Sequence, residues 1–193
     1  SDVGALITSA IPKDDGSYEI SGQKIYISWG EHDLTENICH LVLARLPNSE
    51  KGTRGISLFL IPKYLPNASG EITERNGVKV SGLEEKMGLH GSPTAVMDYK
   101  KAKGWLVGKP NQGMKTMFTM MNNARLGVAV QGLSQAERAL QKAVRHSKER
   151  KQGRSQIENS LGTIIDHADV RKNLLIMKAL TSISRSLCLD TAI

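Results

Sequence analysis

The chain has 193 residues, 39% of them hydrophobic and 23% charged, a composition that suits one sizeable core or two modest ones and excludes a disordered chain. Polar residues interrupt every long apolar run, so the sequence predicts no transmembrane span. The net charge is +7, and the whole excess lies in residues 111–154, which contain nine basic residues and only two acidic ones, Glu137 and Glu149. Such a local positive field suits a polyanion, for example nucleic acid, a membrane face or a phosphate-rich cofactor, or it marks a solvated helix face.

Residues 1–110 show the pattern of a β-domain. Short runs rich in β-branched and apolar residues recur between turn signals such as Asp14-Asp15-Gly16 and Asn76-Gly77. Many short strands with regular turns predict an antiparallel barrel or sandwich. The expected strands are Ala5–Ile11, Tyr18–Ile20, Lys24–Ser28, Ile38–Arg45, Gly55–Ile61, Val78–Val80, Ala95–Tyr99 and Gly104–Val107.

After residue 110 the period changes from 2 to 3.6, so we expect helices to begin between Asn111 and Lys115. The apolar face of the first helix is expected to hold Leu126, Val130, Leu133, Leu140 and Val144. A polar linker over residues 151–155 should follow, and Asp166 is expected to cap a second helix. The apolar face of that helix would hold Val170, Leu174, Met177, Ile183 and Leu187. Facing apolar stripes predict an antiparallel pair, and two helices rarely make a stable domain alone.

Two cysteines are too few for a disulfide framework, and we expect Cys39 and Cys188 to be buried free thiols in a reducing cytoplasm. The five histidines show no metal-ligand spacing with one another or with the cysteines, so no metal site is predicted.

Five segments, in order along nearly the whole chain, carry a resemblance to one known family. They are Ser1–Leu6, Ile20–Ser28, Lys86–Thr94, Asn111–Gly113 with Ala124–Leu133, and Glu149–Gln152. The first three resemble the acyl-CoA dehydrogenase signatures T-E-P-x-A-G-S-D-V (its second half), L-x-G-x-K-x-W-I-T and K-M-G-x-x-x-S-P-T. The last two are similar to the entry to the family's first C-terminal helix and to the start of its E-R-x-x-F-G element. Five ordered matches are far more specific than any one alone.

Three further segments resemble the enlarged branch of this family that includes 3-methylthiopropanoyl-CoA dehydrogenases. They are Lys103–Gly108, Met117–Asn122 and His167–Arg171. The chain departs from the pattern at Ala168, where that branch typically has Pro, and at Gly153-Arg154, which replace the Phe-Gly of the commoner enzymes.

The resemblance implies a multi-domain protein with both α and β parts. This chain would be an internal fragment that holds the middle β-domain (residues 1–110) and the first part of a C-terminal antiparallel helical bundle (residues 111–193). It implies FAD as cofactor, an acyl-CoA thioester as substrate, electron-transfer flavoprotein as acceptor, and a homo-oligomer, either a dimer or a tetramer. No membrane partner is expected.

The resemblance also assigns roles to individual residues. Ser28 would donate a hydrogen bond to the flavin edge beside Ile27, and Tyr26 stands where the family commonly has a Trp packed beside the flavin. Ser1 would contact FAD phosphate or the thioester ligand. Near the start of the basic helix, Asn122 and Arg125 would meet the CoA moiety, since an Arg at a helix N-terminus suits phosphates. The remaining pair, Arg150 with Gln152, would reach the FAD pyrophosphate of a partner subunit.

No catalytic residue is expected within the chain. The implied reaction needs a carboxylate to remove the α-proton of the thioester, and the family places that Glu on a helix beyond these residues. Some members instead place it just before the Arg that opens the first bundle helix, where this chain has Ala124. The fragment alone is therefore expected to be inactive.

Two alternatives stay open. An acyl-CoA oxidase would share all these residues and would use oxygen as acceptor. A DNA-binding flavoprotein relative of the alkylation response would explain the basic stretch 111–154, although aromatic residues that could stack on bases are only 4% of the chain.

Overall fold

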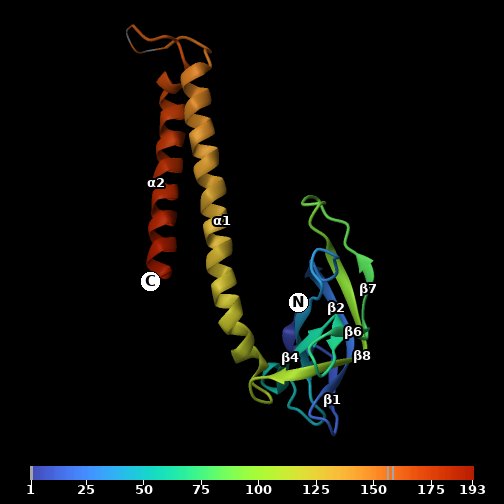
Figure 1. The fold of residues 1–193 in the computed structure, drawn as a ribbon. Coiled ribbons are helices and arrows are strands. Elements are labelled where there is room, and N and C mark those ends of the chain that lie inside the picture. The colour runs from blue at the N-terminus through green and yellow to red at the C-terminus, as the bar shows by residue number, and fades with distance from the viewer. Residues whose placement is uncertain (1, 156, 158) are drawn as a thin grey trace. The chain divides into compact units, whose positions relative to one another are not determined.

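The computed structural model describes residues 2–155, 157 and 159–193. The chain forms two compact units, Ser1–Thr119 and Met120–Ile193, each described here by itself. The first is a β-structure and the second a pair of helices (Figure 1), as the sequence predicts.

The first unit contains a six-stranded sheet with the strand order β2-β1-β3-β4-β8-β7. An additional pairing of β2 with β8 closes five of these strands into a barrel, and β7 lies on the other edge of β8. All pairings are antiparallel except the short parallel contact between β1 and β3. The strands are β1 (Ser9–Pro12), β2 (Tyr18–Ser28), β3 (Cys39–Arg45), β4 (Ile56–Pro62), β7 (Val78–Leu83) and β8 (Thr94–Val107).

Two pairs of predicted strands are single long strands. The expected break at Ser21-Gly22 is a β-bulge within β2, where φ of Gly22 is 149° and an added Cβ would lie 2.7 Å from Thr8 Oγ1. The charged stretch around Lys101 also leaves β8 unbroken, because Ala102 and Gly104 point into the barrel. The predicted division into Tyr18–Ile20 and Lys24–Ser28, and into Ala95–Tyr99 and Gly104–Val107, is therefore wrong.

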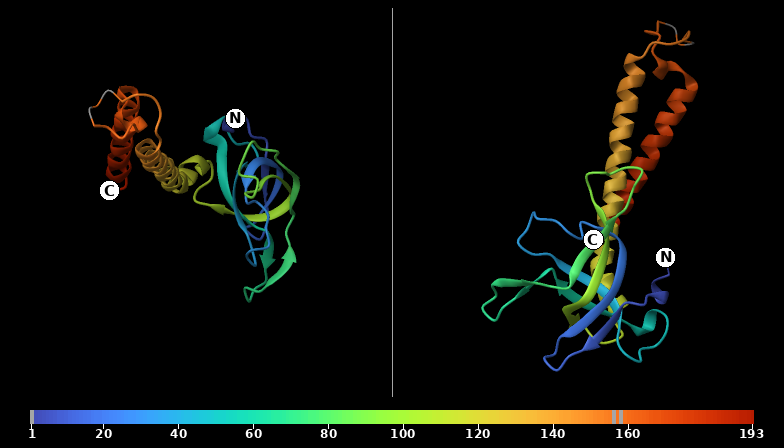
Figure 2. Two further views of the ribbon diagram at one scale, coloured as in Figure 1. Left: turned by 90° about the horizontal axis from the view of Figure 1, so that it is seen from above. Right: turned by 90° about the vertical axis from the view of Figure 1, so that its right-hand side faces the viewer.

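A second, two-stranded sheet was not predicted. It pairs β5 (Tyr64–Pro66) with β6 (Ile72–Arg75) and projects from the barrel as a hairpin (Figure 2). All four residues of β6 are exposed, so the hairpin lacks the apolar alternation that identifies a strand.

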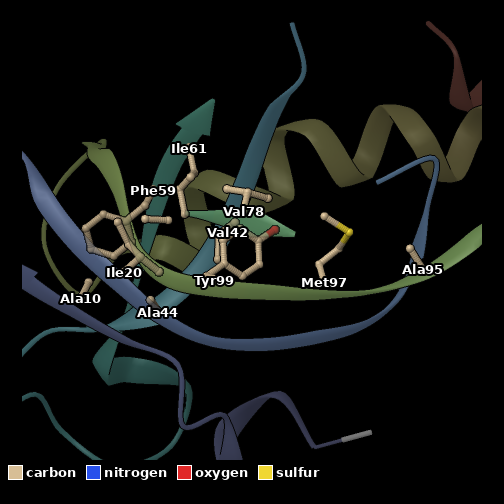
Figure 3. Close-up of a cluster of buried hydrophobic side chains, with 11 residues drawn as sticks. Ala10, Ile20, Val42, Ala44, Phe59, Ile61, Val78, Ala95, Met97 and Tyr99 are labelled. Carbon is tan, nitrogen blue, oxygen red and sulfur yellow. The ribbon is translucent and has the colours of Figure 1, made fainter. Parts of the chain in front are cut away.

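The barrel interior is the core of the first unit (Figure 3). Phe59 and Met97 are fully buried, and the Tyr18 ring packs against the Phe59 ring with centroids 5.0 Å apart. The other buried members of the cluster are Ala10, Ile20, Val42, Ala44, Ile61, Val78, Ala95, Tyr99 and Ala102.

The helices are α1 (Gly113–Glu149) and α2 (Ala168–Thr191). Within the second unit they run antiparallel: a hollow is lined by Leu140 and Leu174 near one end, and another by Leu126 and Cys188 near the other. An ion pair joins Glu137 Oε2 to Arg185 Nη2 at 2.8 Å between them. The apolar faces oppose each other as predicted, yet Ile183 and Leu187 remain exposed.

The predicted cap of α2 is wrong. The N-cap is His167, whose side chain makes no capping hydrogen bond. Asp166 instead ends a short 3-10 helix, η3 (Ile164–Asp166), and its carboxylate accepts a hydrogen bond from Ser160 Oγ. The expected linker after α1 is also partly ordered, because Lys151 forms a β-bridge with Thr163.

The predicted burial of the cysteines is wrong as well. Both are free thiols, but Cys39 is exposed and Cys188 is half-buried. On β3 the inward positions are His40, Val42 and Ala44, which leaves Cys39 on the outward face.

Candidate functional site

A hollow of about 590 Å³ opens in the wall of the barrel between β2 and β3. It exists because β1, the strand between them, is short. Ser9 pairs with both Ser21 of β2 and Arg45 of β3, and β2 and β3 each continue beyond the N-terminal end of β1. The hollow is lined by residues from those two overhangs, together with the floor residues His40 and Tyr99 and the side chain of Met117.

The end of β2 carries three of the predicted cofactor-binding residues. Ile27 and Ser28 line the hollow, and Ser28 is exposed at the last pairing position, opposite Thr94. Tyr26 does not line it. A β-bulge sets Ile25 and Tyr26 together opposite Val96, with φ of Tyr26 at 59°, and leaves the Tyr26 side chain 67% exposed.

Trp29, which the sequence analysis did not single out, follows Ser28 and also lines the hollow. Its backbone adopts φ 56°, and its N–H donates to the Pro93 carbonyl at 3.0 Å. This bond ties the end of β2 to the segment that precedes β8. Non-glycine residues with positive φ are uncommon, and two of the seven among the described residues, Tyr26 and Trp29, flank Ile27 and Ser28.

The rim opposite β2 is η1 (Val3–Ala5) with its neighbours Asp2 and Leu6. Arg45 holds this segment by donating to the Gly4 carbonyl at 2.5 Å and to the Leu6 carbonyl at 3.0 Å. The carboxylate of Asp2 accepts from the Gly4 N–H at 2.8 Å, so it caps η1. Ser1, predicted to bind cofactor and substrate, lies outside the described residues.

An ion cluster around the buried Lys63 fixes the loop that follows Ser28. Lys63, only 7% exposed, pairs with Glu31 and donates to the His32 carbonyl at 2.9 Å. Arg75 pairs with the other oxygen of Glu31 at 2.7 Å. Burial raises the pKa of Glu31, but the hydrogen bonds from Lys63 and Arg75 outweigh this and lower the pKa overall. The carboxylate thus stays charged at neutral pH.

The floor of the hollow contains a buried histidine that the sequence analysis considered only as a metal ligand. His40 Nδ1 lies 2.7 Å from the hydroxyl of Tyr99, and His40 Nε2 is buried without a hydrogen-bond partner among the described residues. Burial lowers the pKa of His40 and raises that of Tyr99, so both are neutral near pH 7. Nearby, burial lowers the pKa of Lys24 to about 8, which leaves one cationic side chain at the hollow.

The predicted CoA contacts lie in the second unit. Asn122 Oδ1 accepts from Arg125 Nη1 at 3.5 Å, and both residues line a hollow of about 640 Å³ between α1 and α2. They lie nine and twelve residues after Gly113, where α1 begins. A helix-terminus contribution to phosphate binding therefore does not apply to Arg125, since that effect is confined to the first turn.

Arg150 and Gln152, the predicted pyrophosphate contacts, lie just after the C-terminal end of α1 and are exposed. Their backbone is fixed: the Arg150 carbonyl accepts from Ile164 N–H at 2.8 Å, and the Gln152 carbonyl lies 2.8 Å from His167 Nε2. Both side chains thus project from an ordered turn.

Four basic side chains come together at one hollow of the helix pair. Arg145 and Lys148 of α1, with Arg171 and Lys178 of α2, line a hollow of about 740 Å³ whose floor is apolar. Residues 2–155, 157 and 159–193 contain no cluster of His, Cys, Asp or Glu that could hold a metal ion. Within the same ranges, no helix is long and apolar enough to cross a membrane.

The architecture is that of the flavin-dependent acyl-CoA oxidoreductases. The family profile described as "Acyl-CoA dehydrogenase, middle domain" matches residues 1–102, and "Acyl-CoA dehydrogenase, C-terminal domain" matches residues 111–193. The chain belongs to the acyl-CoA dehydrogenase family, whose members are flavoproteins, and the resemblance seen in the sequence is confirmed.

Individual relatives agree with this assignment. The 3-methylmercaptopropionyl-CoA dehydrogenase of Ruegeria pomeroyi is 49% identical over 99% of this chain and 33% of its own length. The broad-specificity linear acyl-CoA dehydrogenase FadE5 of Mycobacterium tuberculosis is 40% identical over 100% of the chain and 33% of its own. The structure of butyryl-CoA dehydrogenase from Megasphaera elsdenii superposes with a TM-score of 0.76 at 27% identity, over 97% of this chain and 44% of that one. The chain spans about a third of the length of these curated relatives.

Proposed function

We propose that the complete protein is an FAD-dependent acyl-CoA dehydrogenase, which converts an acyl-CoA thioester to its α,β-unsaturated product, and that the barrel hollow is one wall of its flavin site. The observation that carries the proposal is a coincidence of fold and motif. The segment that resembles the family's flavin-contacting stretch ends at Ile27 and Ser28, and these residues line the hollow in the barrel wall.

The residues at the hollow suit a planar heteroaromatic ring with a polar edge. Its walls are mainly aliphatic, with Ile25, Leu41 and Leu43 among them, and a small number of polar groups converge on it. Those groups are the Ser28 hydroxyl, the buried His40 ring and the Lys24 ammonium. FAD, when bound, supplies the acceptor for the hydride that leaves the β-carbon. The protein residues orient the ring, keep water from one face and place a positive charge nearby.

The reaction also needs a group that removes the proton from the α-carbon of the thioester. Among the described residues that line the hollow, Asp2 is the one carboxylate, and it is already engaged in capping η1. Ala124 has no titratable group. We therefore assign the general base to a part of the complete protein outside these 193 residues.

Two further elements belong to the proposal. Arg150, held at the end of α1, contacts the FAD pyrophosphate of a partner subunit with the support of Gln152, which makes the complete protein a homo-oligomer.

Electron-transfer flavoprotein serves as the acceptor, and the reaction takes place in the cytoplasm. A structure described as "Electron transferring flavoprotein of Acidaminococcus fermentans: Towards a mechanism of flavin-based electron bifurcation" contains a chain that superposes with a TM-score of 0.76 at 29% identity.

The test uses the complete protein. It should retain FAD on purification, and its flavin absorption should bleach on anaerobic addition of a suitable acyl-CoA. The panel should include straight-chain acyl-CoAs and 3-methylmercaptopropionyl-CoA. Ser28→Ala should slow bleaching, whereas Ser81→Ala, an exposed strand serine outside the hollow, should not.

Two outcomes would contradict parts of this assignment. A protein that retains no flavin, or whose flavin no acyl-CoA reduces, is not a dehydrogenase of this kind. Rapid reoxidation by oxygen with hydrogen peroxide formation would instead identify an acyl-CoA oxidase, and salt-dependent retention on DNA would favour the DNA-binding alternative.

A further inference from the structure

The His40–Tyr99 pair contains a buried hydrogen-bonding atom that has no partner among the described residues. His40 lies on β3, is 9% exposed, and lines the hollow together with Tyr99 of β8. Its Nε2 atom is buried and has no hydrogen-bond partner among the described residues. Buried polar atoms are nearly always paired, and an exception calls for an explanation such as an absent ligand.

The tautomer of His40 follows from the network around it. The Tyr99 ring is 3% exposed, and its hydroxyl contacts His40 Nδ1 at 2.7 Å, with the two rings edge to face at 78°. A buried phenol must place its proton on an acceptor, and Nδ1 is the one partner described for it. The neutral imidazole therefore accepts at Nδ1 and carries its proton at Nε2, where it can act only as a donor.

The surroundings keep that donor neutral and fixed. Burial lowers the pKa of His40, and the Gly30 carbonyl and Glu31 oppose this to a smaller extent. The cations nearby include Lys24 at the hollow, and Lys63 and Arg75, which both pair with Glu31. The Gly30 backbone is close enough to the imidazole to raise its pKa, while Nε2 has no hydrogen-bond partner among the described residues.

We propose that His40 is a ligand-binding residue whose Nε2–H donates a hydrogen bond to an acceptor on the polar edge of the ring bound in the hollow, and that Tyr99 is the positioning residue that fixes the donor tautomer. The ligand class is a heteroaromatic ring with carbonyl oxygens or unprotonated ring nitrogens, so this inference rests on the proposed flavin site. It adds a contact made from the barrel interior, where the predicted contacts Ile27 and Ser28 come from the end of β2.

The experiment measures FAD binding by the apo form of the complete protein. His40→Phe keeps a ring and removes the donor, so we expect affinity to fall by about tenfold, as for the loss of one buried hydrogen bond, and the flavin absorption band to shift. His40→Gln can return an N–H close to the position of Nε2 and should recover most of the affinity and the band position. His90→Phe, in an exposed loop away from the hollow, is the matched control and should match the wild type.

A second measurement separates binding from folding. His40→Phe removes the unpaired Nε2 but also the acceptor of the buried Tyr99 hydroxyl, so the melting temperature of the apo protein should fall modestly. The rise in melting temperature on adding FAD, measured from each variant's own apo value, should shrink in His40→Phe. Should His40→Phe fail to fold, Tyr99→Phe replaces it, with an expected loss of a few-fold because the donor tautomer is no longer fixed.

The outcomes are distinct. If the wild type holds no FAD, the proposed function fails. If the wild type binds FAD and His40→Phe, or Tyr99→Phe in its place, binds it equally well with an unchanged spectrum, the inference about His40 is overturned while the function stands. Equal losses in His40→Phe and His40→Gln would also overturn the donor role.

Discussion

Replacing Lys63 by Met should destabilise the β-unit far more than replacing Arg75 by Met, although both cations pair with Glu31. Lys63 has a side chain 9% exposed and donates to the His32 carbonyl, while the Arg75 side chain is 42% exposed. Met retains the apolar stem that packs in the barrel wall. The substitution therefore isolates the ammonium group and the two bonds that it makes to the loop after Ser28.

The expected magnitude follows from those bonds. A hydrogen bond from a charged donor contributes about 1.5–3 kcal/mol, and breaking a buried ion pair costs about 3–5 kcal/mol when the partner is left uncompensated. Arg75 still neutralises Glu31 in the variant, so we expect a loss near the lower figures, about 2–3 kcal/mol. Arg75→Met leaves Lys63 in place and breaks a pair whose side chains are 42% and 25% exposed, so about 1 kcal/mol is expected.

Tryptophan fluorescence during urea unfolding is a suitable assay, because the two tryptophans, Trp29 and Trp105, both belong to the β-unit. Hydrogen exchange at the amides of residues 29–35 should accelerate in Lys63→Met, since that loop loses its anchor. Equal urea midpoints for the two variants, or unchanged exchange in the loop, would refute the reasoning that burial makes Lys63 the dominant partner.

Three other predictions concern the barrel, the histidine and the helix end. Gly104→Ala should cost about 1–3 kcal/mol in urea unfolding, because its Cβ would lie 2.8 Å from the Leu60 carbonyl oxygen, whereas Gly127→Ala on α1, with no atom of the described chain within 4 Å, should be neutral or stabilising. Burial lowers the pKa of His40 below its ordinary 6.5, so the unfolded chain binds more protons than the folded one. The free energy of unfolding should therefore keep its full value above pH 6.5 and fall below that pH, and His40→Phe should flatten this dependence. Arg150→Ala in the complete protein should weaken FAD retention by about 1.5–3 kcal/mol and leave turnover of the FAD-saturated enzyme nearly intact; equal FAD affinity by titration of the apo form would contradict the phosphate role.

Local pattern was enough to predict where β-structure gives way to helix. The change of period after residue 110 predicts helices from Asn111–Lys115, and α1 begins at Gly113. Local pattern was insufficient where a bulge resembles a break, as at Gly22. It was also insufficient on β3, where apolar residues occupy both faces, so the alternation that exposes Cys39 and buries His40 cannot be read from residue type.

The hollow itself could not be derived from any one segment. It results from a length mismatch between β1 and its two neighbours, which appears only when the pairing register is known. The sequence could name Ile27 and Ser28 through a motif, but His40 and Trp29 reach the same hollow through the tertiary structure. A histidine on an alternating strand carries no sequence signal that distinguishes a core residue from a ligand contact.

The closure of the barrel by β8 has a consequence for how the protein is made. Residue 18 pairs with residue 104 and residue 28 with residue 94. The pairing partner of β2 is therefore synthesised only when most of the unit has already been made. Until β8 has left the ribosome, β2 and β4 each have an open edge with inward side chains that nothing covers, and such long-range pairing is slow. A nascent chain that ends near residue 90 should therefore be sensitive to protease and bind holdase chaperones, whereas one extended so that Val107 is free should become resistant in a single step.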